Sequence, residues 1–237
     1  MSKIKRVLSI DMDYIMAPSI SLYEDLIGRP EFKGQSFWSQ VNSIRNVDAH
    51  IEYDKGSLLF LIRLFSKSIA GLDPRNIFFC EEHDMILEFL TGDAGKSGEV
   101  FDLYNVDHHH DVYFNDRQKE EVERFDFACL ANWVYYLGDN EKLAKYHWVR
   151  NAASSNFNEE DKKDLLFPFE EILEGRDRLF DIEFDYVCVC KSNDYFPEKY
   201  HQFFYMLKEI AEGLKGGEFF VWNTDYCENG RTRHVCP

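Results

Sequence analysis

The sequence lacks a long apolar run and has few basic residues. No segment approaches the roughly 18 to 20 uninterrupted apolar residues that are needed to cross a bilayer, so no membrane-spanning segment is predicted. There are 27 Lys and Arg against 43 Asp and Glu, which gives a formal net charge of -16. Nucleic-acid binding requires clustered basic side chains, so this charge argues against a DNA or RNA partner. An acidic surface suits cationic partners, although acidity mostly serves solubility.

Paired cysteine motifs are also missing. The six cysteines include no C-x-x-C pair, and Cys188 and Cys190 lie in an apolar run where small buried side chains are ordinary. Reduced thiols explain them and predict a cytoplasmic protein. With 237 residues, of which 45% are hydrophobic, the chain can form one α/β domain over residues 1–237 with a sizeable core.

The most informative segment follows the strand-like run 101–106. Asp107, His109 and Asp111 occupy alternate positions directly after it. Alternate side chains of an extended segment point in the same direction, so these three are expected to face one place. The carboxyl end of a strand is where open α/β sheets bind their ligands. A metal site is therefore the favoured interpretation, and a solvated, highly charged turn is the alternative.

Two further apolar runs end in side chains of the same kind. The run 7–10 is followed by Asp11 and Asp13, and the run 76–80 is followed by Glu81, Glu82 and His83. Neighbouring parallel strands lie about 4.8 Å apart, so side chains from three adjacent strand ends can converge. Six ligands are too many for one tetrahedral zinc, and an oxygen-rich set with some imidazole favours two manganese ions. The candidate ligands are Asp11, Asp13, His83, Asp107, His109 and Asp111.

These motifs resemble those of the ureohydrolases, the family that includes arginase and agmatinase. Ser9-x-Asp11-x-Asp13 is similar to one ureohydrolase motif, and the D-x-H-x-D at 107–111 is similar to another. Arginases place S-x-D-x-D late, whereas this chain opens with it. Together with the E-x-H-D at 81–84 and the Asn-Trp pair at 132–133, this order resembles the peptide arginases. Those arginase-like enzymes convert arginine side chains to ornithine within ribosomally made precursor peptides. The resemblance spans residues 7–137.

The resemblance implies an arginase-like, three-layer α/β/α domain with a mostly parallel sheet and two Mn(II) ions. It implies hydrolysis of an arginine guanidinium to ornithine and urea, by attack of a metal-bridging hydroxide that Asp13 also orients. One ion would be held by His83, Asp107, Asp111 and Asp11. The other would be held by His109, Asp107, Asp11 and Asp13. Asp107 and Asp11 would then bridge the two ions, and the partner would be an arginine-containing peptide.

Two roles have no motif in the sequence, namely gripping the guanidinium and shuttling a proton. Glu82 flanks His83 and Asp194 follows the strand-like run 186–190, so both are candidates for the grip. A supporting or surface carboxylate is the alternative for Glu82, and a charge at a helix N-terminus is the alternative for Asp194. His108 and His110 should point away from the ligands because they alternate with them. His50 and Glu52 could enter the site from a loop.

Other readings of the same motifs remain open. Haloacid-dehalogenase phosphatases also begin with a strand and D-x-D. They require Thr or Val two residues after the second aspartate, where this chain has Ile15. The DHH phosphoesterases pair an early D-x-D with Asp-His-His and bind two manganese ions, yet they leave His83 and Asp111 without a role. Two further alternatives are another ureohydrolase-like or deacetylase-like amidohydrolase, and a non-catalytic arginase-like domain that binds a peptide. The sequence favours a peptide over free arginine only weakly, and it predicts no oligomeric state.

The rest of the chain alternates expected strands and helices. Apolar runs predict strands at 145–149 and 186–190, and helical periodicity predicts helices at 85–90, 120–137 and 198–214. The helix 120–137 is interpreted as mainly structural. The acidic stretch 159–185 interrupts the alternation and is expected to be a peripheral excursion.

Overall fold

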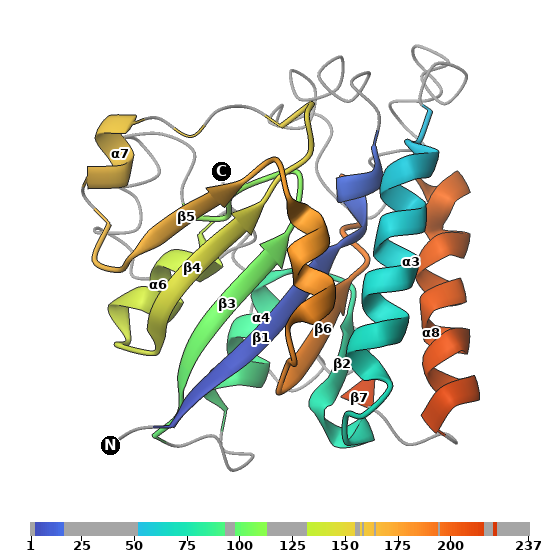
Figure 1. Cartoon of the computed structure of the whole chain (residues 1–237), viewed down its shortest axis with the longest axis horizontal. Helices are drawn as coiled ribbons and strands as arrows, with labels where there is room; N and C mark the ends of the chain where they lie inside the picture. The colour runs from blue at the N-terminus through green and yellow to red at the C-terminus, as the bar shows by residue number, and fades with distance from the viewer. Residues whose placement is uncertain are drawn as a thin grey trace, which may run out of the picture.

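A computed structural model describes residues 3–16, 52–92, 98–112, 132–154, 157, 159–163, 165–193, 195–215 and 220–221. Their strands form one sheet in the order β5-β4-β3-β1-β6-β2-β7, and every pairing is parallel (Figure 1). The strands are β1 (Ile4–Asp11), β2 (Ile77–Cys80), β3 (Val100–Val106), β4 (Leu143–Val149), β5 (Phe169–Ile172), β6 (Tyr186–Cys190) and the two-residue β7 (Phe220–Val221).

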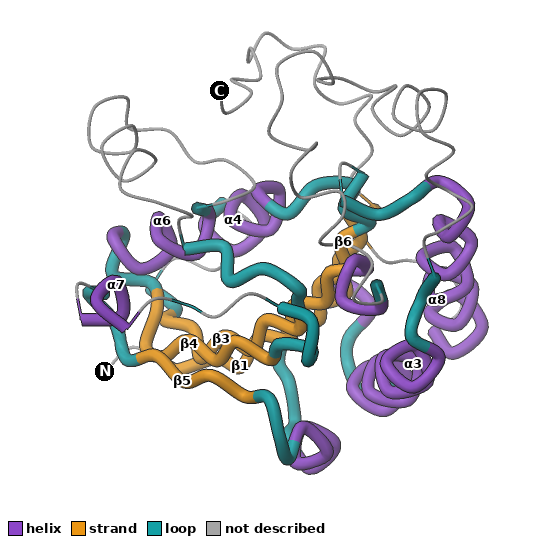
Figure 2. The backbone as a smooth tube through the Cα atoms, turned by 90° about the horizontal axis from the view of Figure 1, so that it is seen from above, coloured by secondary structure: helices purple, strands orange, loops and turns teal. Residues whose placement is uncertain are grey.

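Helices flank both faces of this sheet. Figure 2 shows α4 and α6 on one side, and α3 with α8 beside it on the other. The α-helices are α3 (Lys55–Ile69), α4 (Asp84–Thr91), α6 (Trp133–Asp139), α7 (Glu159–Lys163) and α8 (His201–Lys215). The 3-10 helices are η1 (Met12–Ile15), η5 (Pro74–Asn76), η6 (Arg176–Asp181) and η7 (Glu198–Tyr200). The layers are therefore helix, sheet and helix, as predicted.

The central strand β6 explains why the chain forms three layers. Val187 and Val189 pack with the core under α3 and α8, whereas Tyr186, Cys188 and Cys190 pack with the core under α4 and α6. All five side chains are buried. Because side chains alternate between the faces of a strand, a run that is apolar at every position needs helices on both sides. The sheet accordingly separates two hydrophobic cores.

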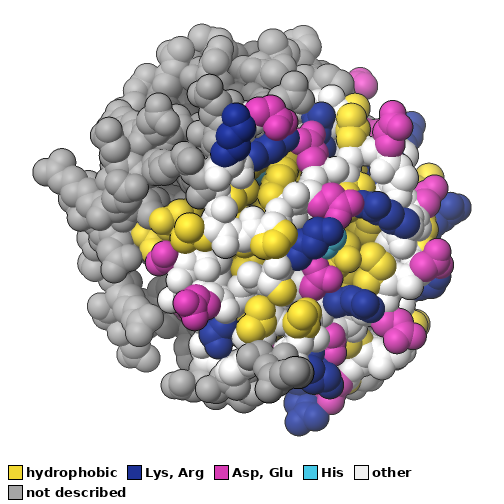
Figure 3. All heavy atoms as spheres, turned by 60° about the vertical axis from the view of Figure 1, so that its left-hand side comes forward, with side chains coloured by type: hydrophobic (Ala, Val, Ile, Leu, Met, Phe, Trp, Pro, Cys, Tyr) yellow, Lys and Arg dark blue, Asp and Glu magenta, His cyan; other side chains and the backbone are white. Residues whose placement is uncertain are grey.

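The edge strand β5 corrects one expectation. The acidic stretch 159–185 is not only a peripheral excursion, because β5 lies within it and pairs with β4. Glu170 on β5 accepts hydrogen bonds from Lys145 and Arg178. Figure 3 brings this side of the molecule forward and shows acidic and basic side chains interspersed with hydrophobic ones. The two basic side chains offset the charge of Glu170 within the strand, and charged side chains on an edge strand discourage pairing with another chain.

The remaining elements follow the expectations in part. The strands at 145–149 and 186–190 and the helices at 85–90 and 198–214 are confirmed. Helix α3 was not expected, and only the last part of the helix predicted at 120–137 is described, as α6. In the described ranges no helix has the length and apolar character to cross a membrane.

Candidate metal centre

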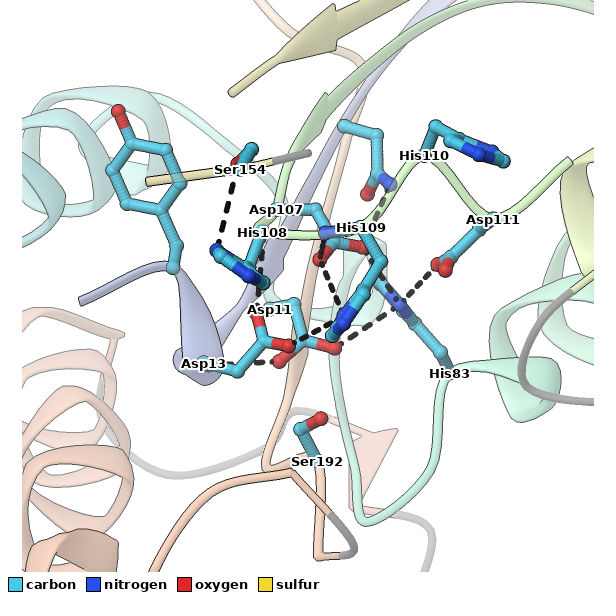
Figure 4. A network of polar contacts seen from close by, with 12 residues as sticks. Asp11, Asp13, His83, Asp107, His108, His109, His110, Asp111, Ser154 and Ser192 are labelled. Atoms are coloured by element: carbon cyan, nitrogen blue, oxygen red, sulfur yellow. Dashed lines mark hydrogen bonds and ion pairs between the residues drawn. The ribbon is translucent and has the colours of Figure 1, made fainter. Parts of the chain in front are cut away.

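The site begins where β1 and β3 end side by side. Ile10 and Val106 are register partners, so Asp11 and Asp107 follow at neighbouring strand ends. Asp11 caps η1, and its Oδ1 accepts a hydrogen bond from the Asp13 backbone N–H at 2.9 Å. This short turn directs Asp13 toward Asp11 and His109 (Figure 4). All three carboxylates are buried.

His83 reaches the cluster from farther away than expected. Its strand, β2, does not neighbour β1, because β6 lies between them, so the expectation of three adjacent strand ends is wrong. His83 lies three residues beyond β2, as the cap of α4. Backbone bonds from Lys191 N to Cys80 O and from Ser192 N to Glu81 O hold this loop on β6. The loop therefore carries the imidazole past the end of β6.

One nitrogen of His83 faces three carboxylates. Its Nδ1 lies 3.2 Å from Asp11 Oδ2, 3.3 Å from Asp107 Oδ2 and 2.6 Å from Asp111 Oδ2. The other ring nitrogen, Nε2, lies 3.0 Å from Ser9 Oγ. The serine of the S-x-D-x-D motif thus fixes the ring so that Nδ1 faces the carboxylates. We call the space around His83 Nδ1 the inner position.

Asp111 joins the inner position through an unusual backbone conformation. Its φ is 51°, in the left-handed region that few residues other than glycine adopt, although Asp tolerates it better than most. Trp133 Nε1 donates a hydrogen bond to Asp111 Oδ2 at 2.7 Å. The Val134 backbone N–H donates to the Asp111 carbonyl at 3.1 Å. The start of α6 therefore holds both the backbone and the carboxylate of Asp111.

A second group of ligand atoms forms around His109. Its Nδ1 lies 2.9 Å from Asp13 Oδ2 and 4.0 Å from Asp107 Oδ1. We call this the outer position, because the His109 side chain is 14% exposed, against 5% or less for the five other predicted ligands. Asp107 turns Oδ2 to the inner position and Oδ1 to the outer one, so it lies between the two.

Burial and mutual repulsion perturb the carboxylates. Burial, together with the charges of neighbouring carboxylates, raises the pKa of Asp11 and of Asp13 well above the usual range, and raises that of Asp111 to about 6. For Asp107, burial is outweighed by the hydrogen bond and charge of His83, and its pKa is lowered. Burial also opposes the charge on His83, but Asp111 and Asp11 raise its pKa. The cluster has more acidic groups than imidazoles to offset them.

The donor atoms fit a divalent metal. Asp13 Oδ2 is buried and has no hydrogen-bond partner in the described part of the chain, since its 2.9 Å approach to His109 Nδ1 lacks hydrogen-bond geometry. A cation between these two atoms would satisfy both. Three overlapping groups have their ligand atoms within 4.8 Å of one another. They are Asp11, His83 and Cys190; Asp13, Asp107 and His109; and His83, Asp107 and Asp111.

All six predicted ligands therefore lie together, whereas the described candidates Glu82 and Glu52 are not among the three groups. Glu82 is half-buried and belongs to none of the three groups found among the described residues. Its neighbour Glu81 pairs with Lys191 at 3.0 Å. Glu52 is exposed. Asp194 and His50 lie outside the described residues.

Sequence reasoning missed several neighbours of the cluster. Cys190 is the register partner of Asp11 on β6, a pairing that no local pattern reveals. Trp133 was expected in a mainly structural helix and in the Asn-Trp pair of the resemblance, but its hydrogen bond to Asp111 was not predicted. Tyr195 places its ring 4.7 Å from that of His109.

The two intervening histidines differ from each other. His110 points away from the ligands, as expected, and packs against Trp148 and Phe157 (Figure 4). Burial lowers its pKa to about 3. His108 is buried beside the cluster. Its backbone N–H donates to Asp13 Oδ1 at 3.2 Å, and its Nδ1 lies 3.5 Å from Ser154 Oγ.

Comparison with known proteins adds no relative. No protein-family model, curated protein or solved structure matched the chain. The fold and the site thus define a single α/β domain with an all-parallel sheet and buried His/Asp clusters that are compatible with metal binding.

Proposed function

We propose that this protein is a manganese-dependent hydrolase that converts the guanidinium group of arginine, within a peptide, to ornithine and urea. One observation carries the proposal. The side chains of three separate motifs, which resemble those of the ureohydrolases, meet in one buried cluster at the carboxyl ends of the strands. Open α/β sheets bind ligands at that edge.

The cluster offers donor atoms for two ions with a shared ligand. His83, Asp11 and Asp111 surround the inner position, and His109 and Asp13 surround the outer one. Asp107 offers one oxygen to each. Asp107 has Oδ2 3.3 Å from His83 Nδ1 and Oδ1 4.0 Å from His109 Nδ1, whereas the contact of Asp11 Oδ2 is to His83, so Asp107 is the better supported bridge. Oxygen donors with one imidazole per ion suit manganese.

Two such ions would supply a nucleophile at neutral pH, by lowering the pKa of a water that they share. The reaction adds water to the guanidinium carbon, Cζ, and breaks the Cζ–Nε bond, so that Cζ leaves in urea. Nε remains on the side chain as the ornithine amine once it has gained a proton. The chain's part is to orient the reactants. Asp13 is fixed through Oδ1 by the His108 N–H, which leaves Oδ2 directed at the outer position.

The substrate would approach from the outer side. His109 is the most exposed of the six ligands, and the Tyr195 ring lies against it. An aromatic face beside an acidic cluster attracts a planar cation such as guanidinium. The grip on the guanidinium is proposed for Glu82 or Asp194, as the sequence suggested.

A phosphoesterase of the DHH type is the rival binuclear enzyme. It would use Asp107 and His109 but has no need of the inner ligands His83 and Asp111, which lie 2.6 Å apart. The geometry therefore favours the ureohydrolase. A non-catalytic arginase-like domain would bind metal and peptide without turnover. An activity assay distinguishes it from the proposed hydrolase.

Urea release from an arginine-containing peptide and from free arginine tests the proposal. The manganese-loaded protein should release urea from the peptide and convert arginine to ornithine, as detected by mass. Asp107→Asn, which changes an oxygen ligand at nearly constant size, should abolish release. If neither substrate reacts although two manganese ions bind, the proposed reaction is wrong, and phosphodiesters become the next substrates to test.

A further inference from the structure

One carboxylate oxygen of Asp111 contacts both the imidazole of His83 and the indole N–H of Trp133. This oxygen, Oδ2, lies 2.6 Å from His83 Nδ1 and 2.7 Å from Trp133 Nε1. The indole N–H is only a donor and does not titrate, so it always offers a proton to this oxygen. It occupies one lone pair of Oδ2 and leaves the other lone pair and Oδ1 for a metal.

Trp133 is itself firmly placed. Its side chain is fully buried in the core under α4 and α6, and its ring lies 5.1 Å from that of His83. The next residue, Val134, bonds the Asp111 carbonyl. Asp111 needs such support, because its left-handed backbone is sparsely populated and persists only where the surroundings determine it.

We propose that Trp133 is a positioning residue that holds Asp111 on the inner position and thereby sets the metal affinity of that position selectively. The inference rests on the metal part of the proposed function, not on the reaction. Partners that orient a metal ligand commonly change metal affinity by about 10- to 100-fold when they are removed. The effect should be confined to the inner position, because the polar contact of Trp133 is to Asp111, which belongs to that position.

Trp148 offers a matched control. It is buried in the same core, and its Nε1 donates to the backbone carbonyl of Asp107 at 3.2 Å. Trp133→Phe and Trp148→Phe therefore remove the same group from the same core, but only the first removes a bond to a carboxylate of the inner position. Calorimetric titration of the metal-free proteins with Mn(II) measures the affinity of each binding event.

Trp133→Phe should weaken one of two binding events by about 10- to 100-fold and leave the other unchanged, whereas Trp148→Phe should change neither by that much. Equal effects of the two variants, or equal weakening of both events by Trp133→Phe, would overturn the inference. Asp111→Asn, which keeps the indole packing, should weaken the same event. The double variant should be less affected than the sum of the two single changes, because both act through one contact.

The outcomes separate this inference from the proposed reaction. If the wild-type protein binds two ions but releases no urea, the reaction fails, while the titrations still decide the role of Trp133. If the wild-type protein binds no metal, the inner position does not exist and the inference falls with it.

Discussion

The inner and outer positions use similar donors but are built differently. At the inner position His83 is held on both ring nitrogens, by Ser9 Oγ at 3.0 Å and by three carboxylates. Asp111 is held in turn by Trp133. At the outer position Asp13 Oδ2 lacks a hydrogen-bond partner within the described ranges, and His109 is partly exposed.

This difference indicates that the two positions bind metal with different affinities and have different roles. Ligands whose orientation is fixed before binding lose less freedom when the metal arrives, so the inner position should bind more tightly. The outer position has an unsatisfied oxygen and solvent access, so it should exchange its ion more readily and meet the substrate. The comparison teaches that burial and supporting hydrogen bonds, rather than ligand type, distinguish the two positions.

The largest effect should come from removing the ligand that both positions share. Asp107→Asn should reduce the bound manganese from two ions to less than one, as measured by metal analysis after dialysis. Asp102→Asn is the matched control, because Asp102 lies on the same strand and contacts His147 at 2.9 Å instead. Retention of both ions by Asp107→Asn would refute the role of Asp107 as a ligand that both positions share.

Single histidine changes should separate the two positions. His109→Asn should leave one ion bound with nearly unchanged affinity, because the inner ligands are intact. His83→Asn should abolish the tighter event. His147→Asn, which changes a buried histidine outside the cluster, should alter neither. Calorimetric titration measures the affinity of each binding event. Equal losses of affinity in His83→Asn and His109→Asn would show that the inner and outer positions are not distinct.

The pH dependence of stability should reveal the acidic cluster in the metal-free protein. The pKa of Asp111 is raised from 3.8 to about 6 in the fold. A carboxylate with a raised folded pKa stabilises the fold below its unfolded pKa, and this stability is lost as the pH rises through the folded pKa. Ionisation of Asp111 should therefore lower the free energy of unfolding by about 3 kcal/mol between pH 4 and pH 7.

Asp11 and Asp13 act in the same direction over that window, because their raised pKa values make the folded state bind more protons than the unfolded chain. His83, whose pKa is also raised, continues the fall above its unfolded pKa of 6.5. The lowered pKa of Asp107 matters only at more acidic pH. Denaturant unfolding with a chelator should show falling stability toward neutral pH, and manganese should remove most of the fall. An unchanged slope with manganese would contradict a metal at these carboxylates.

The smallest effect should come from Cys190, the soft donor beside the inner position. Cys190→Ser should leave Mn(II) affinity nearly unchanged and weaken Cd(II) binding by about tenfold, because thiol sulfur favours softer metals. Cys188→Ser is the matched control, since Cys188 is buried on the same strand and face. Competition titration measures both affinities. Equal effects of the two variants would place Cys190 outside the inner position.

The sequence could predict the ligands that stand at or just after strand ends. Asp107 and His109 follow β3, and Asp11 ends β1, so the shared edge of a parallel sheet placed them together. Asp13 was predicted from alternation, but it faces the cluster through the short helix η1. Asp111 was predicted from the same alternation, yet it faces the cluster through a left-handed backbone and a bond from Trp133. There the expectation agreed with the structure for a different physical reason.

Sequence patterns could not predict the contacts between residues that lie far apart in the chain. The position of β6 between β1 and β2 depends on which strands pair across more than 100 residues, and no periodicity encodes that. The contacts of Cys190 and Trp133 with the cluster were consequently not predicted. Strand β5 was missed because its charges, which protect an edge, resemble those of a solvated loop. Strands with apolar faces, such as β3 and β6, were found because burial imposes their composition.

Titration of the metal-free wild-type protein with Mn(II) tests the central claim most directly. We predict two bound ions per chain with distinguishable affinities, the tighter one lost in His83→Asn and the weaker one lost in His109→Asn. Absence of binding, or a single ion that both variants lose equally, would contradict the existence of two different metal positions at this edge of the sheet.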